Sequence, residues 1–271
     1  MGNCSSCPSK NGCTSQSTCN IQNNPNNKIG KIIGIMSGKG GVGKSTMTTL
    51  IAKKLNNMGY KVGILDADIT GPSIPRLMGI RNGKAYQGPN GIIPVKSSNG
   101  IKIMSINLMT DDESQPVVWR GPMVGNVVKQ FYSDVLWEEL DYLLIDMPPG
   151  TGDVALTVMQ SIPISGIIMV SVPQDLVSMI VSKAVNMAAM MNINVLGVVE
   201  NMSYIQCPDC NKKIKLFDGV ETERFLKGME LDLLGELPMT KEIIDITHNN
   251  INEMSCELDS VLNNIINKIN Q

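Results

Sequence analysis

A glycine-rich stretch near the amino terminus constrains this chain more than any other feature. Residues 37–46 are Ser-Gly-Lys-Gly-Gly-Val-Gly-Lys-Ser-Thr, which satisfies the pattern G-x-x-x-x-G-K-[ST] from Gly38 onward. An apolar segment at 29–36 precedes it and a helical pattern at about 45–58 follows, so it connects a strand to a helix. There, backbone N–H groups and the helix N-terminus surround phosphate oxygens. The candidate nucleotide-binding residues are Gly38, Lys39, Gly40, Gly41, Val42, Gly43, Lys44, Ser45 and Thr46.

Two lysines of this loop have different expected roles in catalysis. Lys44 is expected to reach the β- and γ-phosphates of ATP, and Ser45 is expected to bind Mg²⁺. Lys39 is not required by an ordinary phosphate loop, and its position resembles the deviant Walker A motif of the MinD, ParA and ArsA class of dimeric ATPases. The resemblance implies that Lys39 reaches the partner subunit's nucleotide, as an arginine finger does, an effect worth about 10³–10⁵ in rate in GTPases. The alternative is a solvated lysine.

Strand patterns alternate with helical patterns along most of the chain, which predicts an α/β fold with a doubly wound, mostly parallel sheet. The predicted strands are 29–36, 61–66, 101–106, 142–146, 166–172 and 195–200, and the predicted helices are 45–58, 121–137, 153–161, 175–191 and 257–271. Residues 79–100 predict turns with a short hairpin, and residues 201–219 predict an irregular segment. One P-loop ATPase domain is therefore expected at 28–271, after a Cys-rich, disordered tail at 1–27.

Three aspartates follow predicted strands at the edge where α/β sheets bind ligands. Asp66 is expected in the outer coordination sphere of Mg²⁺, and Asp68 is expected to orient or deprotonate the attacking water. Asp146 ends an apolar strand in the Walker B pattern and is expected to bind Mg²⁺ directly or through water. The alternative for the pair at 66 and 68 is a turn that caps the next helix.

Asn201 follows the predicted strand at 195–200. Its side-chain amide both donates and accepts hydrogen bonds, so it could match the ring nitrogen and amine of adenine. Asn is also common in turns after strands, which is the alternative.

The seven cysteines divide into three groups. Cys207 and Cys210 form one C-x-x-C pair, which is consistent with half a metal site, a redox dithiol or a turn. A [4Fe–4S] cluster needs four thiolates, and a twofold dimer would supply the other two. Cys256 stands alone and is predicted to be an inert, buried thiol. The tail cysteines could close a second, iron–sulfur or zinc, site within one chain; they are Cys4, Cys7, Cys13 and Cys19.

From Ile32 to about Asp245 the chain resembles the Mrp/ApbC family of iron–sulfur cluster carrier ATPases. Besides the loop, the matching segments are 66–73 (Asp-Ala-Asp-Ile-Thr-Gly-Pro-Ser), 119–122 (Trp-Arg-Gly-Pro), 146–153 (Asp-Met-Pro-Pro-Gly-Thr-Gly-Asp) and 199–204 (Val-Glu-Asn-Met-Ser-Tyr) ahead of the C-x-x-C pair. The resemblance implies a homodimer that hydrolyses ATP slowly, holds a [4Fe–4S] cluster between its two C-x-x-C pairs, and delivers it to apoproteins. The tail resembles that of the eukaryotic cytosolic scaffold branch, except that Cys19 lies downstream of the other three.

Other classes of protein receive less support from the sequence. The net charge of −2 does not indicate a nucleic-acid partner. The chain shows no signal peptide or membrane-spanning run, so we expect it in the cytoplasm without a membrane partner. Alternatives are a MinD- or ParA-like membrane or spatial-positioning ATPase, a nucleotide-regulated zinc protein, and a lipid anchor on the Met1–Ser6 myristoylation pattern. A positioning ATPase would need a basic amphipathic C-terminal helix, yet Lys268 is the only cation in 257–271.

Overall fold

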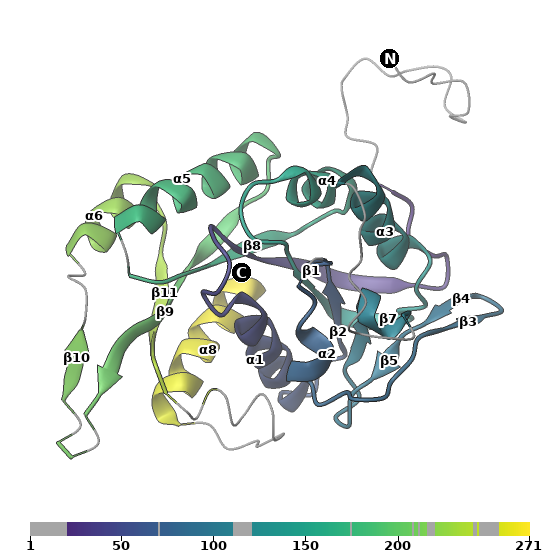
Figure 1. The fold of residues 1–271 in the computed structure, drawn as a ribbon, viewed down its shortest axis with the longest axis horizontal. Coiled ribbons are helices and arrows are strands. Elements are labelled where there is room, and N and C mark those ends of the chain that lie inside the picture. Colours follow the sequence, from purple (N-terminus) through teal and green to yellow (C-terminus); the bar gives the residue numbers. More distant parts are fainter. Residues whose placement is uncertain are drawn as a thin grey trace.

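The computed structural model describes residues 21–69, 71–110, 121–173, 175–207, 209–210, 212–215, 220–240, 243 and 255–271. Within these residues, a nine-stranded sheet lies between helices on both of its faces (Figure 1). The strand order is β10-β9-β8-β1-β7-β2-β6-β5, and β11 pairs with β9. The pairs β5–β6 and β9–β10 at the two ends are antiparallel, and the other pairs of this sheet are parallel. The predicted doubly wound α/β fold is confirmed.

The elements follow one another along the chain as the alternation of patterns predicts. The strands are β1 Lys28–Ser37, β2 Val62–Asp66, β3 Tyr86–Gly88, β4 Gly91–Ile93, β5 Val95–Lys96, β6 Lys102–Met104, β7 Glu139–Asp146, β8 Gly166–Ser171, β9 Val195–Gln206, β10 Lys213–Lys215 and β11 Leu233–Pro238. The helices are α1 Lys44–Asn57, α2 Ile74–Leu77, α3 Gly121–Ser133, α4 Asp153–Ser161, α5 Asp175–Met190, α6 Val220–Gly228 and α8 Cys256–Asn270, with a 3₁₀ turn η1 at Ile106–Leu108.

Two hydrophobic layers hold the helices to the sheet. Successive residues of a strand point to opposite faces, so Ile32 of β1 packs in one layer and Ile33 in the other. The first layer contains Val128 of α3 and Val158 of α4, and the second contains Leu50 of α1 and residues of α8. The phosphate loop therefore leaves a strand that is buried on both faces, in the middle of the sheet.

The C-terminal helix α8 buries its apolar stripe in the second layer, on the same face of the sheet as α1. The buried residues are Leu258, Val261, Leu262, Ile265, Ile266 and Ile269. The prediction that this helix packs on the domain is confirmed, and the stripe is not available to a membrane surface. Among the described residues, no helix is long and apolar enough to cross a bilayer.

Two element boundaries and the exposure of one cysteine differ from the sequence-based expectation. The segment after Asn201 is not irregular, because β9 continues to Gln206, where β11 and then β10 pair with it. The helix α3 ends at Ser133 rather than near 137, since Val135 bridges to Ile92 and the Trp137 indole N–H donates to the Phe131 carbonyl. Cys256 is exposed, so the prediction of a buried thiol there is wrong. The short hairpin within 79–100 is confirmed as β3–β4.

Residues 21–27, which the sequence assigns to the tail, lie against the domain. The Ile21 N–H donates to the Ser161 carbonyl at 3.1 Å, and the Ile21 side chain packs on the first hydrophobic layer. Asn27 Nδ2 donates to the Val135 carbonyl at 2.8 Å. Contacts with the domain therefore already include Ile21, seven residues before the predicted boundary at 28. The four tail cysteines and the expected disorder of 1–20 lie outside the described residues.

Candidate functional site

The phosphate loop lies between the end of β1 and the start of α1, at the carboxyl edge of the parallel strands. Gly41 and Gly43 have φ values of 81° and 84°, a conformation that favours glycine. A Cβ on Gly43 would collide with the side-chain amide of Asn201. The loop borders a cavity of about 370 Å³, lined by Ser37, Gly40, Gly41, Gly43, Lys44, Ser45, Thr46, Asp68, Gly71, Ser73, Leu77, Pro149 and Met202.

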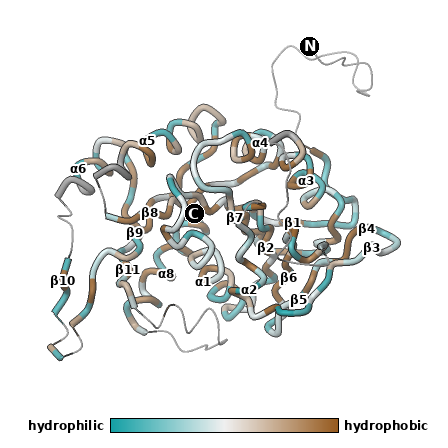
Figure 2. Tube along the Cα trace, in the orientation of Figure 1, coloured by the Kyte–Doolittle hydropathy of each residue, from teal (hydrophilic) through white to brown (hydrophobic). Residues whose placement is uncertain are grey.

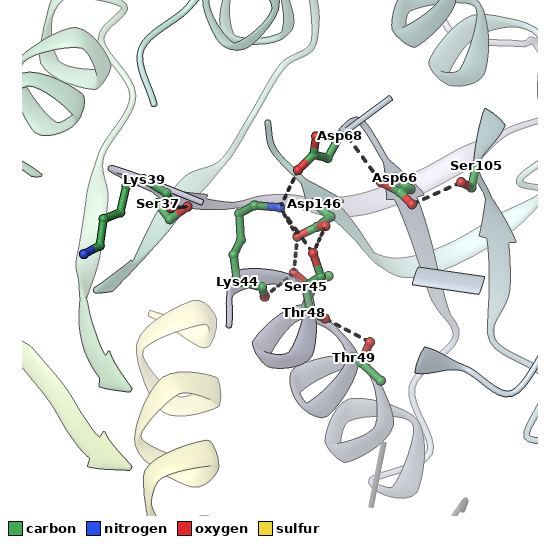
Figure 3. A network of polar contacts seen from close by, with 10 residues as sticks. All are labelled: Ser37, Lys39, Lys44, Ser45, Thr48, Thr49, Asp66, Asp68, Ser105 and Asp146. Carbon is green, nitrogen blue, oxygen red and sulfur yellow. Dashed lines mark hydrogen bonds and ion pairs between the residues drawn. The ribbon is translucent and has the colours of Figure 1, made fainter. Parts of the chain in front are cut away.

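Lys44 and Asp146 form the centre of the polar network at this cavity (Figure 3). Lys44 Nζ lies 2.8 Å from Asp146 Oδ1, and both side chains are buried. Ser45 Oγ donates to Asp146 Oδ2 at 2.6 Å, and Thr48 Oγ1 donates to Asp146 Oδ1 at 2.8 Å. The structure thus brings together the predicted phosphate lysine, Mg²⁺ ligand and Walker B aspartate.

Thr48 and Ser105, which bond the aspartates of this network, are absent from the sequence-based site. Thr48 follows Lys44 by one helical turn, and its hydroxyl lies 3.1 Å from the Lys44 carbonyl as well as bonding Asp146. Ser105, buried just after β6, donates to Asp66 Oδ2 at 3.1 Å. The i, i+4 spacing from Lys44 could have indicated Thr48. Nothing local in the sequence marks Ser105, since its partner is on another strand.

Asp66 and Asp68 lie at different depths of the same site. Asp68 Oδ2 is 3.9 Å from Lys44 Nζ at the cavity wall. Asp66 is buried, and its carboxylate also accepts the Asp68 N–H at 3.2 Å. Burial raises the pKa of Asp66 well above its usual range, the negative charge of Asp146 raises it further, and Lys44 opposes the shift. The structure therefore favours the neutral form of Asp66 more than water does.

The substitution Asp66→Asn is expected to raise the free energy of unfolding of the nucleotide-free protein at neutral pH. Well below the ordinary aspartate pKa of about 3.9, both proteins carry a neutral side chain there in the folded and unfolded states, so the difference is small. As the pH rises through the raised pKa of Asp66, the wild type loses stability that the amide variant keeps. Urea unfolding between pH 4 and 8 measures this. A wild type that gains stability over the variant as the pH rises would contradict the assignment.

Oxygen ligands for Mg²⁺ are present in the site. Ser45 Oγ is hydrogen-bonded to the Asp146 carboxylate, Lys44 Nζ lies 2.8 Å from Asp146 and 3.9 Å from Asp68, and hard oxygen donors of this kind suit the ion. The donor set therefore fits Mg²⁺, with Ser45 and Asp146 as the residues that would hold it. When bound, the ion would neutralise charge on the phosphates.

Asn201 lies within β9 rather than in a turn after it. Its buried side-chain amide donates from Nδ2 to the Val42 carbonyl at 2.9 Å, which fixes the phosphate loop to β9. A contact of Asn201 with adenine stays a prediction.

Lys39 is directed away from the carboxylates. Figure 3 shows its side chain on the opposite side of the loop from Lys44 and Asp146. This direction agrees with a role outside the chain's own magnesium site. That the residue acts in the partner subunit's site stays a prediction.

The C-x-x-C pair lies at the turn that joins β9 to β10 (Figure 1). Cys207 is half-buried, Cys210 is exposed, and both are free thiols. The Cys207 N–H donates to the Lys212 carbonyl at 3.0 Å, which closes the hairpin. Hydrogen bonds to its sulfur from the backbone N–H groups of Asp209 and Cys210 lower the pKa of Cys207. Among the described residues, no three or more His, Cys, Asp or Glu side chains form a group that could hold a metal ion, so the pair has no third ligand of these types beside it.

Iodoacetamide is expected to alkylate Cys207 at a lower pH than an ordinary thiol. Only the thiolate reacts, and a lowered pKa means that the thiolate is populated at lower pH. Peptide mass spectrometry of the reduced apoprotein across a pH series gives the midpoint, with N-acetylcysteine as the reference thiol. A midpoint for Cys207 at or above that of the reference would contradict the effect of the two backbone donors.

A glycine loop between a strand and a helix, with aspartates at the ends of neighbouring parallel strands, defines a P-loop NTPase. The chain matches, over residues 28–271, the model of the ParA family described as NUBPL iron-transfer P-loop NTPases, and it belongs to that family.

Individual relatives agree with this assignment. An iron–sulfur cluster carrier protein of Clostridium perfringens is 49% identical over 265 residues, which cover 92% of this chain and 93% of the relative. The structure of a nucleotide-binding protein from Archaeoglobus fulgidus, in complex with ADP, has a TM-score of 0.74 and 40% identity over 85% of this chain and 91% of its own. The cell division ATPase MinD of Pyrococcus furiosus, at 20% identity over 88% and 99% of the two chains, has a TM-score of 0.63 and shares the fold. The resemblances to the cluster carriers and to the MinD-like fold are confirmed.

Proposed function

We propose that this protein is an ATP-dependent carrier of iron–sulfur clusters that passes a [4Fe–4S] cluster to apoproteins. One observation carries the proposal: strand β9 contacts the nucleotide site through Asn201 and ends at the thiol pair that begins with Cys207. The relatives named as iron–sulfur cluster carriers support it, as does the description of the family as iron-transfer NTPases.

In the ATP step, the phosphate loop binds the nucleotide and Lys44 binds its β- and γ-phosphates. Asp68, at the cavity wall 3.9 Å from Lys44 Nζ, orients or deprotonates the attacking water. Lys39 of one subunit completes the site of the other, so hydrolysis needs a homodimer. Slow turnover is expected as long as that lysine is not in place.

In the cluster step, each subunit contributes two thiolates, and two subunits supply the four that a [4Fe–4S] cluster requires. The lowered pKa of Cys207 favours the thiolate that binds iron. ATP binding or turnover changes the dimer geometry at the paired hairpins and so controls release to the apoprotein. The cluster is cargo, and the exposure of Cys210 leaves it accessible to an acceptor.

The double substitution Cys207→Ala/Cys210→Ala is expected to abolish transfer from the anaerobically reconstituted protein to an apoprotein. Iron, sulfide and absorbance measurements on the loaded protein, followed by recovery of acceptor activity, test this. Cys256→Ala is the matched control, since Cys256 is also exposed, and it should transfer as the wild type does. Undiminished transfer by the double variant would show that the pair is not the working site.

A nucleotide-regulated zinc protein is the second candidate, because two thiolates from each of two subunits also suit tetrahedral zinc. Metal analysis after anaerobic purification separates the two. Zinc without iron and sulfide would overturn the carrier assignment. A wild type that accepts iron and sulfide but gives none to an apoprotein would leave storage rather than delivery as its role.

A further inference from the structure

The hairpin formed by β9 and β10 lies at one end of the sheet (Figure 1 and Figure 2). Ile205 and Ile214 are directly opposite each other in its register, so their side chains project from the same face. They are 37% and 45% exposed, although isoleucine is among the residues most often buried. We call this pair the isoleucine face. It begins two residues from Cys207 along β9.

The other face of the hairpin is held to the domain by polar contacts. Tyr204 Oη donates to Glu257 Oε2 at 2.9 Å, and Lys213 Nζ lies 3.2 Å from Glu257 Oε1. Lys215 Nζ lies 2.7 Å from Glu236 Oε1 on β11. These contacts join the polar face of the hairpin to α8 and β11, so the isoleucine face points away from α8 and β11. The exposed apolar pair is therefore presented in a fixed orientation.

A second copy of this chain is the occupant that the cysteine pair demands. Two thiolates are half of what a [4Fe–4S] cluster requires, and no third potential ligand accompanies them among the described residues. The missing half comes from an identical hairpin, and twofold symmetry places the same patch on both sides of such an interface. Two hairpins joined by a cluster at Cys207 thus bring two isoleucine faces close to it.

We propose that the isoleucine faces of two copies pack together beside the bridging cluster and exclude water from it. The proposal rests on the carrier function proposed above. Solvent exposure and the surroundings of the sulfurs control how readily a cluster is lost, and supporting residues around metal ligands commonly change affinity 10–100-fold. Ile205 and Ile214 would then act as positioning residues: they determine the lifetime of the bound cluster without binding iron.

The test compares cluster loss from reconstituted variants in the absence of nucleotide. The double variant Ile205→Thr/Ile214→Thr keeps β-branched side chains but makes this face polar. We expect its cluster to be lost to a ferrous chelator about 10-fold faster or more, with a smaller dimer fraction in light scattering. Binding of a fluorescent ATP analogue and far-UV circular dichroism should not change, because neither residue lines the chain's own nucleotide cavity.

Two controls keep the result specific. Leu233→Thr polarises a residue of the same sheet that is 39% exposed but lies on β11, and its cluster should be lost at the wild-type rate. Ile205→Val/Ile214→Val keeps the face apolar and should also behave like the wild type. If the double threonine variant does not fold, the single variant Ile214→Thr, at a position that is 45% exposed, should also lose its cluster faster than the wild type. Equal cluster lifetimes in the wild type and a folded threonine variant would overturn the shielding role alone. A wild type that binds no cluster would overturn the carrier function and this inference together.

Discussion

Replacing Lys44 with methionine is expected to slow ATP hydrolysis by about 10²–10³-fold and to destabilise the fold. Lys44 Nζ lies 2.8 Å from Asp146 Oδ1 and 3.9 Å from Asp68 Oδ2, so its removal leaves buried acidic groups without their cation. Breaking a buried ion pair from one side typically costs about 3–5 kcal/mol of unfolding free energy. Phosphate release from Mg-ATP and urea unfolding at pH 7 measure the two effects.

Lys54→Met is the matched control for this prediction. Lys54 is on the same helix α1 and pairs with Asp259 of α8 at 2.5 Å, but the Asp259 side chain is 41% exposed to solvent, whereas Asp146 is fully buried. Exposed ion pairs contribute about 0–1 kcal/mol, so stability should fall little and hydrolysis should not change. Equal losses of hydrolysis rate and unfolding free energy in the two variants would mean that removing any lysine from α1 has this effect, and that the contacts of Lys44 with Asp146 and Asp68 are not its cause.

Mixing two inactive variants is expected to restore ATP hydrolysis if Lys39 acts in the partner's site. Lys39→Ala alone should reduce the rate by about 10³-fold or more, because the developing phosphate charge loses its cation. In a mixed dimer with Lys44→Met, the Lys39→Ala subunit keeps Lys44 and receives Lys39 from its partner. Random pairing then yields about a quarter of the wild-type activity, since half of the dimers each have one complete site.

The same mixture distinguishes action across the dimer from action within one chain. If Lys39 served its own subunit, neither chain of a mixed dimer would hold a complete site, and the mixture would stay inactive. Nucleotide binding by Lys39→Ala, measured with a fluorescent ATP analogue, should remain close to the wild-type level. A large loss of binding would indicate that Lys39 holds its own nucleotide instead.

Local patterns predicted which residues of the candidate nucleotide site lie together. The loop at 37–46 and the aspartate at the end of a buried strand can each be recognised from a few consecutive residues. The structure brings Lys44, Ser45 and Asp146 within hydrogen-bonding distance. The contacts that support them could not be predicted in this way. Ser105 approaches Asp66 from a neighbouring strand, and Asn201 reaches Val42 across 159 positions of sequence.

The expectations that differ from the structure concern residues whose surroundings are also set by distant parts of the chain. The residues after Asn201 lack a clear strand period, yet pairing with β11 and β10 keeps them extended. Cys256 was predicted to be a buried thiol because it has no partner cysteine nearby, but it begins α8, one residue after the cap Ser255, and is exposed. Residues 21–27 looked too polar to pack, and their asparagines are held by backbone carbonyls that only the folded domain provides.

Strand β9 belongs to both sites. Asn201 on this strand is hydrogen-bonded to Val42 of the phosphate loop, and the strand ends next to Cys207 of the thiol pair. From Asn201 to Cys207 along β9 is about 20 Å, at roughly 3.3 Å per residue. When two ligands influence each other through such a shared element, thermodynamic linkage requires the factor to be the same in both directions. A nucleotide that loosens the cluster tenfold must itself bind tenfold more weakly to the loaded protein. The affinity of the phosphate loop for ATP would then depend on whether the thiol pair holds a cluster, so ATP would distinguish the loaded from the empty protein.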